Sequence, residues 1–201
     1  MTLRVDHSMS EQLAWAQWWA FPWRYAHEDW RSGPHAAIDE LCQGRLMMPG
    51  DFLGVAACLP PPPHPTALRL ALASNEEINL ALTLVHDTFN PETTSALSDS
   101  HHLWCVRLSK ALPPAMLAPD ADPLHLLHSW LAPPIWQRLR LRFSRERARG
   151  VEKRHLRLEN ANNRLDTLWQ AVVWRATSLS GEPIPPTQTD QEISNVMPTH
   201  H

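Results

Sequence analysis

Apolar residues in this chain recur at helical spacing, and prolines interrupt the pattern at short intervals. Ser10 is a candidate N-cap for a first helix over residues 11–20, because its hydroxyl can accept a bond from an N–H of the first turn. Pro22 ends this helix, since proline lacks an N–H and clashes with the preceding turn. Residues 23–31 are expected to form a turn or a short helix. The same spacing predicts further helices over residues 35–46, 66–74, 75–89, 103–112 and 124–131.

Two internal segments depart from this simple pattern. Residues 52–59 are apolar throughout, and periodicity does not decide between a helix and a buried strand. The stretch 60–65 is Pro-Pro-Pro-Pro-His-Pro, which cannot be helical inside and predicts an extended, polyproline-type connector. This connector is the best candidate for an internal boundary.

The C-terminal part carries a long helical pattern from residue 135 to about residue 177, with Gly150 as a candidate break. After Gly181 the chain is polar and contains several prolines. Such a tail has too little apolar surface to offset the entropy of ordering, so we expect it to be disordered. The apolar stripe in the second half of the helical pattern consists of Leu158, Leu165, Leu168, Trp169 and Val172.

The scarcity of glycine, with 6 in 201 residues, and the lack of alternating β-branched runs predict an all-α fold. We expect an irregular multi-helix bundle with a long C-terminal basic helix and a disordered tail. The expected parts are an aromatic-rich N-terminal part (1–59), the proline connector (60–65), a central helical part (66–134), a long Arg-rich helical segment (135–180) and the tail (181–201).

Composition indicates the compartment and the kinds of partner. The net charge of −3 predicts no general affinity for polyanions. The three cysteines are widely spaced and form no Cys-x-x-Cys pair, which is typical of reduced thiols in a cytosolic protein. The N-terminus shows no apolar signal segment, and no apolar run approaches the roughly 20 residues of a membrane span. We therefore expect a cytoplasmic protein.

Tryptophan is concentrated near the start of the chain, where five of the 10 tryptophans lie between Trp15 and Trp30. Each indole buries a large apolar area, and its N–H needs a partner when buried. Two interpretations stay open, because aromatic residues at helical spacing often form a core, whereas Trp and Tyr are also favoured anchors at protein interfaces. As an interface, the segment offers Trp23, Tyr25, His27 and Trp30.

Positive charge is concentrated in residues 138–157, which carry nine basic and two acidic side chains. Such a segment attracts anions. Three alternatives stay open for these basic side chains: they pair with the protein's own acidic surface, with an acidic protein partner, or with nucleic acid or anionic lipid. Arginine outnumbers lysine eight to one here, which favours bidentate pairing with carboxylates. The arginines that we assign to an acidic partner are Arg138, Arg140, Arg142, Arg145 and Arg149.

No set of catalytic or metal-ligating residues accompanies these segments. His125 and His128 lie three apart on one helix face, but no His-Glu-x-x-His and no paired cysteines complete a zinc set. Residues 98–101 contain triad residue types without a nucleophile elbow, and no glycine-rich phosphate loop occurs. The sequence predicts a protein without enzymatic activity, cofactor or metal.

Three short stretches occur in the order found in one family of secretion proteins. They are Pro22-x-x-Tyr25-x-His27, then Leu72-Ala73-Ser74 with Leu82-Thr83-Leu84-Val85, then Trp104-Cys105-Val106-Arg107-Leu108-Ser109 with Leu112-Pro113. Over about residues 20–113 the chain resembles the K component of the type III secretion sorting platform, the family that includes the Yersinia K protein and the HrpD proteins of plant-associated bacteria.

The resemblance implies a cytosolic, non-enzymatic, helical adaptor beneath the inner-membrane ring. In that family the protein links the cytosolic domains of the ring to the Q subunit of the sorting platform, which carries the stalk and the ATPase complex. We accordingly expect partner proteins of these two kinds, no nucleic acid, and a location peripheral to the inner membrane. The alternatives are a helical regulatory protein that binds nucleic acid through its Arg-rich segment, and a secretion chaperone.

Overall fold

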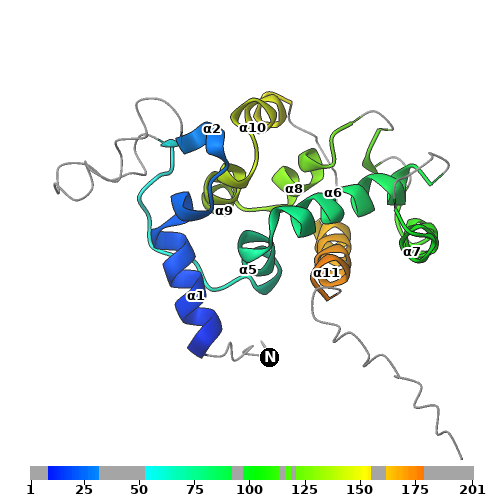
Figure 1. Cartoon of the computed structure of the whole chain (residues 1–201), viewed down its shortest axis with the longest axis horizontal. Coiled ribbons are helices and arrows are strands. Elements are labelled where there is room, and N and C mark those ends of the chain that lie inside the picture. Colours follow the sequence, from blue (N-terminus) through cyan, green and yellow to red (C-terminus); the bar gives the residue numbers. More distant parts are fainter. Residues whose placement is uncertain are drawn as a thin grey trace, which may run out of the picture.

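The computed structural model describes residues 9–31, 53–91, 97–113, 116–118, 121–154 and 162–178. These residues form α-helices and short 3-10 helices without any strand, which confirms the predicted all-α fold (Figure 1). The elements are α1 (Met9–Ala20), η1 (Pro22–Tyr25), α2 (Glu28–Arg31), α5 (Pro65–Leu72), α6 (Asn75–Phe89), α7 (Asp99–Ser109), α8 (Leu124–Trp130), α9 (Pro133–Leu139), η4 (Arg140–Arg142), α10 (Arg145–Glu152) and α11 (Asn162–Ser178).

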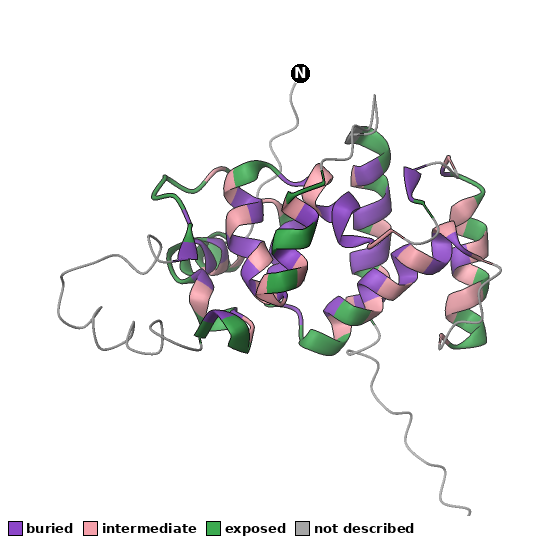
Figure 2. Ribbon diagram, turned by 90° about the horizontal axis from the view of Figure 1, so that it is seen from above, coloured by how far each residue is buried: buried purple, intermediate pink, exposed green. Residues whose placement is uncertain are grey.

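The helices form two groups that meet at α5 and α8 (Figure 1). In one group, α11 packs against α5, α6 and α8, and α7 packs against α6. In the other group, η1 contacts α9 and η4, while α1 reaches α5 and α10 reaches α8. Buried positions face the middle of the molecule, and exposed positions lie on the outer faces of the helices (Figure 2). None of the helices in the described part of the chain has the length and apolarity needed to cross a bilayer.

Prolines and capping residues in the sequence mark several of the helix ends. α1 ends at Ala20, and Pro22 begins η1. Ser74 separates α5 from α6 and forms a capping box, in which its hydroxyl accepts from the Glu77 N–H at 3.1 Å while the Glu77 carboxylate accepts from the Ser74 N–H at 2.7 Å. The predicted cap at Ser10 is wrong, because Ser10 already lies inside α1.

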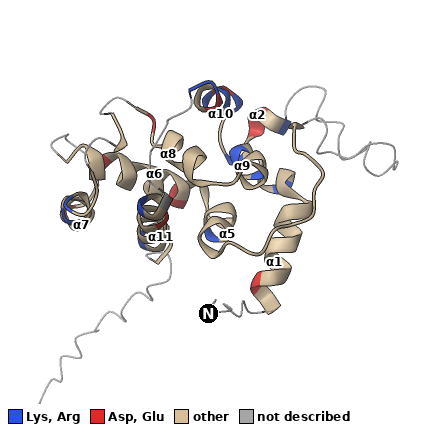
Figure 3. Ribbon diagram, turned by 180° about the vertical axis from the view of Figure 1, so that it is seen from behind, with Lys and Arg blue, Asp and Glu red and all other residues tan. Residues whose placement is uncertain are grey.

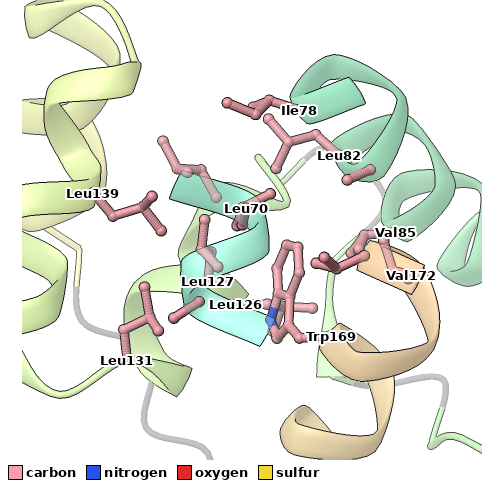
Figure 4. Packing of buried hydrophobic residues seen from close by; sticks show 14 of the residues in the cluster. Leu70, Ile78, Leu82, Val85, Leu126, Leu127, Leu131, Leu139, Trp169 and Val172 are labelled. Atoms are coloured by element: carbon pink, nitrogen blue, oxygen red, sulfur yellow. The ribbon is translucent and has the colours of Figure 1, made fainter. Parts of the chain in front are cut away.

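A single large hydrophobic cluster holds both groups of helices together. It contains Trp15, Trp18 and Trp19 of α1 together with buried side chains from α5 to α11. The core interpretation is confirmed for these three indoles, and the core continues across the predicted boundary at residues 60–65. Figure 4 shows part of this core, in which Trp169 of α11 lies among side chains of the other helices, including Leu70, Ile78, Leu82, Val85, Leu126, Leu127, Leu131, Leu139 and Val172.

Residues 55–64 form neither a helix nor a strand, although the apolar pattern of 52–59 predicts one of the two. Their backbone groups pair with side chains of distant helices instead. The Trp19 indole donates to the Cys58 carbonyl at 2.9 Å, and the Trp15 indole donates to the Pro61 carbonyl at 2.9 Å. Gln137 accepts from the Ala56 N–H at 3.0 Å. These bonds replace the hydrogen bonds of a helix or sheet, because buried backbone groups need partners.

The long basic helix expected over 135–180 is divided into several elements. The break comes at Phe143 and Ser144, where Ser144 caps α10 through the Arg147 N–H, and not at Gly150, which lies inside α10. The helix predicted over 103–112 begins earlier, at Asp99, because Ser98 caps it. The helix predicted over 35–46 and the tail over 181–201 lie outside the described residues.

Candidate interaction site

The tryptophan segment and the arginine segment, which the sequence presents as separate features, meet in the fold. Trp30 is 5% exposed, and its indole N–H donates to the Phe143 carbonyl at 2.8 Å. The guanidinium carbons of Arg145 and Arg140 lie 4.9 and 5.5 Å from the Trp30 ring centroid, in the range of cation–π contacts. Figure 3 shows the basic positions of α9 and α10 beside α2. A second, small core surrounds this contact and contains Ala26, Trp30, Leu53, Val55, Leu141 and Ala148, with Trp23 packed against it.

Arg138 is the most deeply buried of the arginines that the sequence assigned to a partner, with 4% of its surface exposed. Its guanidinium donates to the carbonyls of Trp19 at 3.1 Å, Pro134 at 3.0 Å and Ala56 at 3.2 Å. It also stacks on the Trp19 ring, with its central carbon 3.7 Å from the ring centroid. Burial lowers the pKa of this guanidinium. Arg138 therefore joins α1, α9 and the extended segment from within.

Arg140 holds the turn at Gly54. Its guanidinium donates to the Leu53 and Gly54 carbonyls at 2.7 and 3.0 Å, and it forms an ion pair with Glu152 at 2.8 Å. Gly54 has a φ of 64°, and a Cβ at this position would lie 2.9 Å from the Arg140 guanidinium. The turn consequently requires glycine for its left-handed conformation, and a Cβ would also displace the Arg140 guanidinium.

Arg147 pairs with Asp122 through two bonds of 2.6 and 2.8 Å. Burial raises the pKa of the Asp122 carboxyl, but the Arg147 guanidinium and the Leu124 N–H more than offset this, so the pKa lies below its ordinary value of 3.8. This pair and the Arg140–Glu152 pair show the arginine segment pairing with the protein's own carboxylates. Nothing local in the sequence indicates that Asp122 pairs with Arg147, because the two residues are 25 positions apart.

The Asp122–Arg147 pair predicts a pH dependence of stability. Because the folded pKa of Asp122 is depressed, its contribution is present above pH 3.8 and is lost as the pH falls through the folded pKa. Asp122→Asn should lower the free energy of unfolding at neutral pH. Its difference from wild type should disappear in acid, where Asp122 of the wild type is protonated. Urea unfolding at a series of pH values measures the effect. Arg147→Gln should show the same loss of unfolding free energy and the same pH dependence. If the losses of the two single variants simply added in the double variant, the pairing would be contradicted.

The nine residues that the sequence assigned to a partner fall into different environments. Trp30 and Arg138 are buried and engaged in intramolecular contacts, so they present no surface to a partner in this fold. The assignment of these two side chains to direct binding therefore does not agree with the structure. The half-buried residues are Trp23, His27, Arg140, Arg142 and Arg145, and the exposed ones are Tyr25 and Arg149.

Part of this set surrounds a surface pocket between η1, α2 and the start of α6. The pocket has a volume of about 440 Å³ and is lined by Tyr25, Ala26, His27, Glu28, Arg31, Asn75 and Arg142. The Arg142 guanidinium forms one wall and donates to the Ala71, Ala73 and Asn75 oxygens at 3.1, 2.6 and 3.2 Å. The sequence gives no signal for Asn75, because this residue comes from a distant helix. Arg31 lies one helical turn after His27, and that spacing alone could have included it.

A second hollow of about 840 Å³ lies between α5 and α11, where His64, Arg69, Asp166 and Trp174 contribute to its lining. The His64 imidazole caps α5 by accepting from the Ala67 N–H at 3.4 Å, and burial lowers its pKa. The sequence assigns none of these residues to a site.

The described residues contain no group of three or more His, Cys, Asp and Glu side chains that could hold a metal ion. The Cys105 thiol is buried, donates to the Leu84 carbonyl at 3.4 Å, and has its pKa raised by burial to about 11. It therefore lacks the thiolate character of a reactive cysteine. Comparison with protein-family models, with curated proteins and with solved structures finds no match for this chain.

Proposed function

We propose that this protein is a non-enzymatic adaptor of the type III secretion injectisome that links the inner-membrane ring to the Q subunit of the sorting platform. The observation that carries the proposal is the placement of the Pro22-x-x-Tyr25-x-His27 element. Pro22 begins η1 and is buried, whereas Tyr25 and His27 line the surface pocket. The short element that carries the resemblance therefore combines one buried residue, Pro22, with two residues that a partner could reach, Tyr25 and His27.

Several residues of the other two stretches of the resemblance support the proposal by their position in the core. Leu82, Leu84 and Val85 are buried on α6, and Cys105 of the Trp-Cys stretch is buried against α6 from α7. Buried residues of this kind fix the shape of the fold, and that shape keeps the first stretch at the surface. An adaptor acting beneath the ring would work in the cytoplasm, peripheral to the inner membrane.

A binding experiment with purified proteins tests the proposal. The full chain is mixed with the Q subunit and, separately, with the cytosolic domain of the ring protein from the same bacterium, and the complexes are measured by light scattering after gel filtration. The double variant Tyr25→Ala/His27→Ala should bind at least one of the two about tenfold more weakly, since anchors of this kind dominate interface energy. Wild-type protein that binds neither would contradict the proposal.

Leu103→Ala provides the matched control. Leu103 is an exposed apolar residue on α7, which lies at the opposite end of the molecule from η1 (Figure 1). Its truncation should leave both complexes unchanged. Equal weakening by the control and the double variant would place the binding surface elsewhere.

The nucleic-acid alternative has less support from the arginine segment. Arg138, Arg140 and Arg142 donate to main-chain carbonyls, and Arg147 pairs with Asp122. Phosphate binding needs free cations along one face. A gel shift on nonspecific DNA at low salt tests this alternative directly.

A further inference from the structure

We infer that the pocket between η1, α2 and α6 binds the carboxylate of a single acidic side chain in an extended segment of the partner protein. This inference rests on the proposed adaptor function and specifies the chemistry of its contact. The sequence assigns Tyr25, His27 and Arg142 to a partner without joining them into a site. Arg31 and Asn75 complete the pocket.

The pocket contains two cations, Arg31 and Arg142. Within the described residues, neither forms an ion pair: Arg31 donates to the Arg24 carbonyl at 2.8 Å, and the nearby Asp29 carboxylate accepts from the Arg145 N–H at 3.3 Å. The Arg142 guanidinium is partly desolvated, and Arg31 is close enough that its charge also lowers the Arg142 pKa. Two like charges in a partly buried pocket leave an unbalanced positive potential, which an anion would relieve.

Asn75 brings a side-chain amide with hydrogen-bond donors to the lining. The Asn75 side-chain oxygen accepts from Arg142 at 3.2 Å, which leaves its amide N–H groups for another acceptor. Asn75 is also the first residue of the 15-residue helix α6, where the helix dipole adds positive potential. Tyr25 also lines the pocket, and it is 40% exposed. These groups match the oxygens of a carboxylate.

The charge of the lining favours one carboxylate over a phosphate or a polyanion. Glu28 belongs to the same lining, so a single negative charge stands against the two guanidinium groups. A more highly charged ligand would meet repulsion from Glu28 and from a chain whose net charge is −3.

Apolar surface next to the pocket points to a peptide and not to a free small acid. Tyr25 lines the pocket and is 40% exposed. Leu72, which is 41% exposed, stands between the two residues whose carbonyls Arg142 holds. Tyrosine and arginine are enriched among the anchors of protein contacts, and exposed apolar side chains beside them give a partner chain surface that a free small acid would not use. We therefore assign the ligand as an acidic residue flanked by apolar residues.

Binding of a defined peptide tests this inference. The probe is the blocked pentapeptide acetyl-Ser-Leu-Glu-Leu-Ser-amide, and its control is the same peptide with Gln in place of Glu. Titration of the 15N-labelled full chain, followed by NMR, should show the Glu peptide binding about tenfold more tightly than the Gln peptide, because the charge-assisted bonds to arginine are lost in the control. Equal affinities, or no binding of either peptide at millimolar concentration, would overturn the inference.

Three variants separate the pocket from general charge and from misfolding. Arg31→Gln should abolish the preference for the Glu peptide, whereas Lys110→Gln, which removes an equal charge from the exposed end of α7, should preserve it. Asn75→Asp places a carboxylate beside Arg142 at the start of α6, so it should abolish the preference while raising the melting temperature. Equal effects of Arg31→Gln and Lys110→Gln would show that only overall charge matters and would refute the pocket.

The same variants distinguish the two proposals. If the ring or Q protein binds wild type and Arg31→Gln equally, the pocket inference is wrong and the adaptor function stands. If the Glu peptide is preferred but neither the ring protein nor the Q subunit binds, the pocket stands and the adaptor function is wrong.

Discussion

Replacing Arg138 by methionine is expected to lower the free energy of unfolding by about 3 kcal/mol. Methionine preserves much of the length and packing of the side chain but removes all donors. The carbonyls of Trp19, Ala56 and Pro134 would then lose the guanidinium that holds them, at a site where Arg138 is only 4% exposed. Urea unfolding followed by tryptophan fluorescence measures the change.

Arg149→Met is the matched control for this experiment. Arg149 is exposed on α10 and lies in the same basic segment, so its replacement should change the free energy of unfolding by no more than about 0.5 kcal/mol. If Arg138→Met proved equally harmless, the carbonyls would have to be satisfied by water, and the internal role of the arginine segment would be refuted.

Replacing Trp169 by alanine is expected to cost roughly 4 kcal/mol of unfolding free energy. Trp169 is 0% exposed and belongs to the main core (Figure 4). It stacks on Trp130 with ring centroids 6.0 Å apart. Truncation opens a large cavity between α11, α5 and α8, because close-packed neighbours collapse only partly. Thermal and urea unfolding both report the loss.

Two further variants make this prediction specific to the buried ring. Trp174→Ala removes an indole from the same helix that is 56% exposed, and it should change the free energy by no more than about 0.5 kcal/mol. Trp169→Phe keeps most of the volume and removes an indole N–H that has no partner in the described structure, so it should cost less than the alanine variant. Equal costs for Trp169→Ala and Trp174→Ala would contradict the burial.

Local signals in the sequence predict most of the helices. Prolines and capping residues act within a few positions, so Pro22 marks the end of α1 and Ser74 marks the start of α6. The apolar stripe of α11 is also visible at helical spacing, and Leu165, Leu168, Trp169 and Val172 are all buried. These features need no knowledge of the neighbouring elements.

The features that depend on distant partners could not be predicted in this way. The segment 55–64 stays extended because Trp15, Trp19 and Arg138 satisfy its carbonyls from other elements. The basic segment divides at Ser144 because its two halves pack on different neighbours, α9 with η1 and α10 with α8. Periodicity within either segment carries no information on these contacts.

The candidate site shows the same limit. Aromatic and arginine residues stand out in the sequence, but nothing local indicates that Trp30 lies under Arg140 and Arg145 or that Asn75 joins Arg142. Composition identifies the residue types, and the fold decides which of them remain accessible.

The contacts of Arg138 with Trp19 and of Trp30 with Phe143 join residues that are 119 and 113 positions apart. During translation, at roughly 5–20 residues per second, the emerging N-terminus must therefore wait on the order of ten seconds before its contacts exist. For that interval Trp15, Trp18, Trp19 and Trp30 protrude from the ribosome without their native cover. The nascent chain is thus a natural client for chaperones at the exit tunnel, and its yield in cells should depend on them.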